Sequence, residues 1–175
     1  MASKIKVDQI QTADGSGTIA LQNQLSGMTT ASLPALGSAQ MPTGSVLQVV
    51  YGSNLTQTTS SSSSYVTTGI TATITPTSTS SKILVLTKMT ARGTTATDVN
   101  TKIYKNSSAI SGMASTKYNN QASEPSDLVD TYLDSPSTTS ATTYTLYAQS
   151  SVNGQAITIK AGNTRGSITL MEIAG

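Results

Sequence analysis

Apolar and β-branched residues recur in short stretches along most of the chain, separated by segments rich in Ser, Thr, Gly and Pro. In residues 70–74 apolar residues alternate with Thr, which is the period of two expected of a half-buried strand. Residues 82–89 are the most apolar stretch, which favours a strand in the middle of a sheet. The pattern predicts strands at residues 46–51, 65–74, 82–89, 99–104, 128–133, 143–149, 156–160 and 167–173. Short strands rich in Thr, Val, Ile and Tyr predict an all-β fold, an antiparallel β-sandwich resembling a jelly roll.

The start of the chain shows a different pattern. Two short β-prone segments, residues 4–10 and 18–22, flank a Gly-containing turn at residues 13–17, which predicts a β-hairpin. Two strands alone are marginally stable in water, so this hairpin is expected to pair with another copy or dock on a partner. A loose leader is the alternative. The apolar residues expected to anchor such an arm are Ile5, Val7, Ile10, Ile19 and Leu21.

A linker is expected to join this hairpin to the strand-rich part. Residues 23–45 have little periodicity and contain two prolines, as is typical of an extended connection. We therefore divide the chain into an N-terminal anchoring arm with its linker, residues 1–42, and a jelly-roll-like β-sandwich, residues 43–175. The Ser-rich runs at 60–64 and 135–140 lie between predicted strands and are expected to be loops of one domain. Gly162 and Gly166 are expected to turn a hairpin.

Composition bears on function through what is missing. His, Cys, Trp and Phe are absent, whereas about a third of the residues are Ser or Thr. General acid–base work near neutral pH most often uses His, and soft metals require Cys or His. The sequence therefore favours a protein that is not an enzyme and carries no cofactor. Without Cys there is no disulfide, so stability is expected to come from packing and association.

Charge and hydropathy narrow the class of partners. Ten Lys and Arg oppose eight carboxylates, which gives a net charge of +2, and the basic residues form no cluster. A nucleic-acid partner is therefore not expected. The longest aliphatic run, residues 83–86, is far too short to cross a bilayer, and no apolar stretch precedes Asp8. We expect a soluble protein without a secretion signal or membrane insertion, synthesised in a cytosol.

Half of the carboxylates fall between residues 124 and 134. Glu124, Asp127, Asp130 and Asp134 could hold Ca²⁺, or two of them could act as a glycosidase pair. The apolar strand pattern between them favours instead solvated strand ends and loops. The many Ser and Lys residues single out no Ser–Lys dyad. No catalytic, cofactor-binding or metal-ligating residue is therefore predicted.

Seven tyrosines are the only aromatic residues. Tyr has a flat apolar ring and a hydrogen-bonding tip, which suits contact with sugars or with a neighbouring subunit. Half-buried packing with a hydrated hydroxyl is expected for the five on predicted strands, Tyr51, Tyr104, Tyr132, Tyr144 and Tyr147. Another, Tyr118, lies in a polar, irregular stretch. A ligand-contacting loop is expected there, made of Lys117, Tyr118, Asn119 and Asn120.

Several segments together resemble a known family. The opening Ser-Lys-Ile-Lys-Val-Asp-Gln-Ile at residues 3–10, followed by Asp-Gly-Ser-Gly-Thr-Ile at 14–19, resembles the N-terminal segment of virion structural proteins of marine bacteriophages, especially cyanobacterial phages. The body resembles the C-terminal β domain of the same proteins, which are commonly labelled tail fibre or virion structural protein. The segments that carry this second likeness are residues 42–50, 80–85, 133–136, 142–144 and 168–173.

This resemblance implies a non-enzymatic, homotrimeric part of the phage exterior. We expect a short fibre or knob on the virion surface, anchored by its arm to other capsid or tail proteins and serving host attachment. A capsid decoration protein that cements neighbouring shell subunits is one alternative. A glycan-binding adhesin module, which would contact a host surface glycan, is another.

Overall fold

The computed structural model describes residues 37, 40–93, 97–110, 115–117, 125–160 and 164–175. The chain divides into two compact units, Met1–Leu36 and Gly37–Gly175. The predicted anchoring residues Ile5, Val7, Ile10, Ile19 and Leu21 all lie outside the described residues. The described strands are β1 (Val46–Asn54), β2 (Thr58–Ser60), β3 (Val66–Ile74), β4 (Lys82–Gly93), β5 (Val99–Lys105), β6 (Ser108–Ala109), β7 (Ser115–Lys117), β8 (Ser126–Asp134), β9 (Thr142–Ser150), β10 (Ile157–Ile159) and β11 (Gly166–Ile173).

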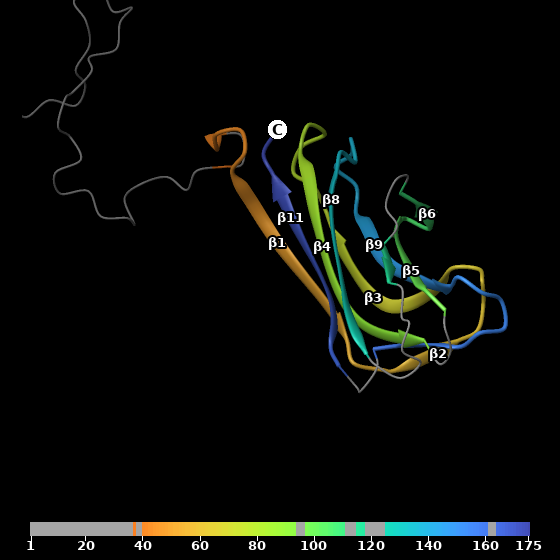
Figure 1. Cartoon of the computed structure of the whole chain (residues 1–175). Coiled ribbons are helices and arrows are strands. Elements are labelled where there is room, and N and C mark those ends of the chain that lie inside the picture. Colours follow the sequence, from red (N-terminus) through yellow and green to blue (C-terminus); the bar gives the residue numbers. More distant parts are fainter. Residues whose placement is uncertain (1–36, 38–39, 94–96, 111–114, 118–124, 161–163) are drawn as a thin grey trace, which may run out of the picture. The chain divides into compact units, whose positions relative to one another are not determined.

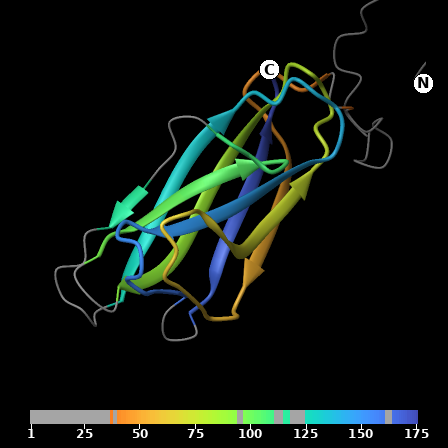
Figure 2. The same ribbon diagram turned by 90° about the vertical axis from the view of Figure 1, so that its right-hand side faces the viewer.

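These strands form two antiparallel sheets packed face to face (Figure 1 and Figure 2). In the first, sheet A, the order is β1–β11–β4–β8. The short strand β10 pairs with the last three residues of β4, and β2 pairs with β10. In the second, sheet B, the order is β3–β9–β5, with β6 and β7 pairing with β5. Successive long strands alternate between the sheets, which is the double-Greek-key arrangement of a jelly roll. The predicted all-β, jelly-roll-like sandwich is thereby confirmed.

All eight predicted strands are present, most with bounds within a few residues of those expected. The most apolar one, β4, lies in the middle of sheet A between β11 and β8, as predicted. The run at 135–140 is a loop, whereas Ser60 ends the short strand β2. The hairpin predicted around Gly162 and Gly166 is wrong. Strands β10 and β11 both pair with β4 and follow one another along it, so they do not pair with each other.

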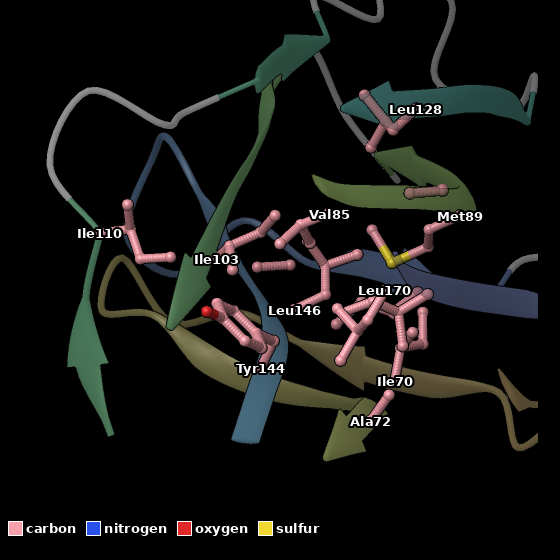
Figure 3. Packing of buried hydrophobic residues seen from close by; sticks show 14 of the residues in the cluster. Ile70, Ala72, Val85, Met89, Ile103, Ile110, Leu128, Tyr144, Leu146 and Leu170 are labelled. Carbon is pink, nitrogen blue, oxygen red and sulfur yellow. The ribbon is translucent and has the colours of Figure 1, made fainter. Parts of the chain in front are cut away.

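The core lies between the two sheets and follows the period of two. In β3, Ile70, Ala72 and Ile74 are buried while Thr71 and Thr73 are exposed. Side chains from both sheets interleave in the same layer, including Leu170 of sheet A and Leu146 of sheet B (Figure 3). Burying one such side chain stabilises a fold by about 1.5–3 kcal/mol. The sandwich therefore depends on one core shared by both sheets.

Two glycines allow the sheets to approach closely beside β3. A Cβ on Gly52 of β1 would lie 2.0 Å from the carbonyl oxygen of Thr71. A Cβ on Gly166 of β11 would lie 2.2 Å from Cδ1 of Ile70. Gly52 therefore requires a residue without a side chain, because backbone lies in the way, whereas a side chain at Gly166 would first have to displace that of Ile70.

The first and last long strands lie next to each other. The N–H of Gly44 donates to the carbonyl oxygen of Ala174, and the N–H of Ala174 donates to that of Ser45, both at 2.8 Å. Because β1 and β11 are antiparallel, the start of one and the end of the other lie at the same end of the sandwich (Figure 1).

Candidate functional site

The predicted ligand-contacting loop falls largely outside the described residues. Lys117 is the last residue of β7, where its backbone pairs with Val99 of β5. Tyr118, Asn119 and Asn120 lie outside the described part of the chain. A ligand-contacting role for this loop stays a prediction.

The acidic cluster does not converge on a single point. On β8, Asp127 lies on the outer side of the sheet, whereas Asp130 and Asp134 lie on the inner side. The latter two are four residues apart, which is about 13 Å along a strand. Within the described residues no three potential ligands gather to hold a metal ion. Glu124 is outside the described residues, and the calcium and glycosidase alternatives gain no support from the other three carboxylates.

Asp134 is buried rather than at a solvated strand end. Its Oδ2 accepts a hydrogen bond of 2.6 Å from the Tyr144 hydroxyl, and its two oxygens lie 3.1 and 2.9 Å from the Lys105 Nζ. Asp134 belongs to sheet A and both partners belong to sheet B, so this group ties the two sheets together. Burial and the neighbouring carboxylate raise the pKa of Tyr144 well above its usual value, which keeps its hydroxyl protonated and donating.

A second buried carboxylate, Glu172, lies within sheet A. Gln48 donates to one of its oxygens at 2.6 Å, and the backbone and side chain of Thr77 both donate to the other at 2.7 Å. Burial alone would raise the pKa of Glu172, but these hydrogen bonds outweigh it and lower that pKa. Each polar contact of Glu172 therefore stays within the fold, where it fastens the turn after β3 to β11.

Lys160 is also buried, at the end of β10. Its ammonium donates to the backbone carbonyl of Thr68 in β3, and burial lowers its pKa. Because β10 belongs to sheet A and β3 to sheet B, this contact ties the two sheets together.

The outer side of sheet A carries apolar residues on all four of its long strands, and Thr169 and Thr131 lie among them. Outward-facing residues in β1, β11, β4 and β8 pair in rows, for example Val49, Met171, Leu84 and Leu133 from one edge to the other. Their exposed members include Val49 at 56%, Tyr51 at 58% and Val129 at 64%. We call this surface the apolar face; its residues are Val46, Val49, Tyr51, Leu84, Leu86, Val129, Leu133, Met171 and Ile173.

Charges lie at the margins of this face. Lys82 and Lys88 stand at the two ends of its β4 segment. Lys88 pairs with Asp127 at 3.1 Å, and both side chains are more than half exposed. Such an exposed pair contributes little stability. The centre is therefore neutral and apolar, with a polar rim, which is the layout of protein–protein interfaces.

The outer side of sheet B differs in chemistry. Hydroxyls of Thr71 and Thr145, and of Thr73 and Thr143, pair across β3 and β9 at 2.9 and 2.8 Å. This side therefore presents a row of neutral hydroxyls that pair across the two strands.

Three tyrosines gather on the same side, and we call them with Lys102 the tyrosine face. Tyr104 and Tyr147 stack with ring centroids 4.0 Å apart, and Tyr65 lies 6.3 Å from Tyr104. The Lys102 ammonium lies 5.5 Å from the Tyr65 ring centroid. Burial, with Tyr104 nearby, raises the pKa of Tyr65. The group combines apolar rings with hydrogen-bonding tips.

The structure revises part of what was predicted for the strand tyrosines. Tyr104, Tyr132 and Tyr147 are half-buried, as predicted. Tyr51 is instead exposed on the apolar face, and Tyr144 is fully buried against Asp134. Its partner is ten residues away in sequence, across a turn and on the other sheet, so no local pattern marks the contact.

A hollow of about 290 Å³ lies at the end of the sandwich where β1 begins and β11 ends. Its lining includes Met41, Leu47, Thr77 and Ala174. It is at the lower limit of small-molecule sites, and its wall offers hydroxyls and apolar side chains without a charge.

No helix among the described residues is long and apolar enough to span a membrane. No family model matches the sequence, and no curated protein matches it. Among solved structures, 16 chains match. One is dimeric latent PorU from Porphyromonas gingivalis, with a TM-score of 0.35 and 13% identity over 77% of this chain and 14% of the PorU chain. This chain thus spans a small part of that protein, and at such a TM-score the likeness carries no argument about function.

Proposed function

We propose that this chain is a non-enzymatic structural protein of a bacteriophage particle, a short trimeric fibre or knob on the virion surface that serves host attachment. The observation that carries the proposal is the apolar face. Within the described residues, nothing covers this apolar surface, which extends over four strands, and a large exposed apolar patch is typical of a surface that packs against another protein. A chain built to assemble requires such a surface.

The residues that resemble phage virion proteins support the same proposal. The segments at 42–50, 80–85 and 168–173 lead into or form β1, β4 and β11, and the segment at 133–136 ends β8. These are the four strands that build the apolar face. The remaining segment, residues 142–144, begins β9 of sheet B, so most of the likeness in the body of the chain falls on the strands of the candidate assembly surface.

The proposal is tested on purified particles of a phage that encodes the chain. Quantitative mass spectrometry should detect the protein in particles after density-gradient purification, with a copy number divisible by three. A non-structural protein of the same phage serves as the negative control. Absence of the chain from purified particles, with the chain abundant in infected cells, would overturn the proposal.

The copy number per particle also distinguishes a position on the capsid shell from a position on the tail. Decoration proteins are expected in hundreds of copies and tail fibres in a handful, so the same measurement decides between shell and tail. Imaging of particles carrying a labelled version of the chain gives the position directly. Label spread over the shell would favour the capsid decoration alternative, and label confined to the tail would favour host attachment.

Glycan binding is a second candidate function, favoured by the tyrosine face. Rings of Tyr65, Tyr104 and Tyr147 with the Lys102 ammonium offer apolar surface and hydrogen-bond donors, which is the chemistry a sugar requires. A glycan array with the full chain tests it, with Tyr147→Ala as the site variant and Tyr51→Ala as the control on the other sheet. Loss of signal only with Tyr147→Ala would support this function, and an array without signal for the wild type would dismiss it.

A further inference from the structure

We infer that the apolar face of sheet A packs against a second copy of this chain, sheet on sheet, and that this contact builds the oligomer. The inference deepens the proposed function and rests on its assembly role. It specifies which surface associates and what covers it.

The first argument is the difference between the two outer sides. Both sheets bury their inner side in the same core. Their outer sides differ: β4 has Leu84 and Leu86 at outer positions, whereas β3 has Thr71 and Thr73 there. A strand that is apolar on both sides is typical of a sheet covered on both sides. Within the described residues, β4 of sheet A is such a strand, but only its inner side is covered, by sheet B.

The second argument is charge. Among the described residues of the apolar face none is ionisable near neutral pH, and the rim residues Lys88 and Asp127 already pair within one chain. A strongly charged partner would find no counter-charge at the centre of this face. A second copy presents the same largely apolar surface, and its Lys82 lies at the edge of the contact, where its ammonium can stay in water. The face is therefore complementary to itself.

The third argument is size. Four strands about 4.8 Å apart and about seven residues at about 3.4 Å each give a face of about 19 Å by about 24 Å. Two such faces together cover about 900 Å². This area, which already includes the rim residues Lys82 and Lys88, is close to the roughly 1,000 Å² that a specific interface needs. Sheets that pack face to face interleave their side chains at about 10 Å separation, as in the sandwich itself.

The test uses the full chain and compares matched substitutions on the two outer sides. Val49→Glu combined with Leu133→Glu places two carboxylates on the apolar face, at positions that are 56% and 50% exposed within one chain. The control, Thr73→Glu, places a carboxylate at an exposed strand position on sheet B. Circular dichroism and thermal unfolding establish that each variant is folded.

Sedimentation velocity over a wide concentration range then measures association. Because a self-complementary face pairs two copies about a two-fold axis, we expect the wild type and Thr73→Glu to sediment at twice the mass of the 18.0 kDa chain; a trimer would require a contact other than this face. The concentration at which half the protein is assembled should rise about a hundredfold or more in the double variant, because carboxylates buried without partners strongly oppose association.

Two outcomes would overturn the inference. A monomeric wild type means that the face is covered by something other than a second copy. An oligomeric double variant means that copies associate through another surface. Neither outcome decides whether the chain belongs to the virion, because the detection of the chain in purified particles answers that question separately.

Discussion

The two outer sides of the sandwich share a fold and differ in chemistry. On sheet A, rows such as Val49, Met171, Leu84 and Leu133 present aliphatic side chains to the surroundings. On sheet B, the corresponding layer presents paired Thr hydroxyls and stacked tyrosines. Each inner side is equally apolar and buries the same core. The outer side of sheet B has the chemistry of a surface that faces water, whereas the outer side of sheet A is the one that we propose to be covered in an assembly.

The two outer sides can be compared only if both sheets share a single core. Substitutions in that core, which should have the largest effect on the free energy of unfolding, test whether they do. Leu170 of sheet A and Leu146 of sheet B are both buried, so Leu170→Ala and Leu146→Ala should each lower the free energy of unfolding by about 2–5 kcal/mol. Urea unfolding followed by circular dichroism measures both. Leu55→Ala, at a half-exposed loop position, is the matched control and should change it by less than about 0.5 kcal/mol. Two separate transitions in either variant would mean that the sheets do not share one cooperative core.

Loss of the contact between the sheets at Asp134 should have the next largest effect on the free energy of unfolding. Asp134→Ala leaves the Tyr144 hydroxyl without its acceptor and should lower the free energy of unfolding by about 1.5–3 kcal/mol. Asp127→Ala, which removes an exposed ion pair on the outer side of the same strand, should cost about 0–1 kcal/mol.

A double-mutant cycle isolates the Tyr144–Asp134 hydrogen bond. Tyr144→Phe in the Asp134→Ala background removes the unsatisfied hydroxyl, so the combined loss should be smaller than the sum of the two single losses. Purely additive losses would show that this bond does not couple the sheets.

Acid should act on sheet A, because its buried Glu172 is held ionised. The folded pKa of Glu172 lies below its unfolded value near 4.5, so its stabilising effect is complete above that pH and is lost as pH falls through the folded pKa. Asp130 acts with the opposite sign, since burial raises its pKa and its protonation favours the folded state. Glu172→Gln should cost about 1–2 kcal/mol at neutral pH and flatten the loss of stability below pH 4.5. Unfolding curves across the acid range measure this, and an unchanged slope would assign acid sensitivity to other carboxylates.

The smallest effect on the stability of a single chain is expected when an apolar residue on the outer side of sheet A and a Thr on the outer side of sheet B are each replaced by the other type. Val49→Thr and Thr73→Val should each change the unfolding free energy of the dissociated chain by less than about 0.5 kcal/mol, because both positions are exposed. Association should respond to one of them. Val49→Thr should weaken the oligomer in sedimentation, whereas Thr73→Val should leave it unchanged; equal effects would remove the distinction between the two sides.

Local periodicity was enough to predict eight of the eleven described strands, but not the short β2, β6 and β7. The alternation of Ile70, Ala72 and Ile74 with Thr identified β3, and the apolar run in residues 83–86 identified a central strand. That run also carried a signal that the strand prediction did not use: Leu84 and Leu86 face outward and are only half-buried within one chain. Sequence alone indicates that both sides of β4 are apolar, but the topology is needed to show which side the chain covers.

Contacts between distant residues could not be predicted. The end-to-end placement of β10 and β11 depends on the length of β4, which pairs with both, so the glycines between them looked like a hairpin turn. Asp134 meets Lys105 only because β8 and β5 belong to opposing sheets. Side chains drawn together by the sandwich, such as those of Tyr104 and Tyr147, likewise have no common spacing in the sequence.

The adjacency of β1 and β11 has a mechanical consequence. Gly44 and Ala174 are hydrogen-bonded neighbours at one end of the sandwich. Tension applied between them would therefore break the hydrogen bonds between β1 and β11 one after another, starting from that end. Tension that enters at Gly44 and leaves through the apolar face would instead load the ladders of sheet A together, in shear. A sandwich of this design resists load best when its far support is the face of sheet A rather than its own C-terminus.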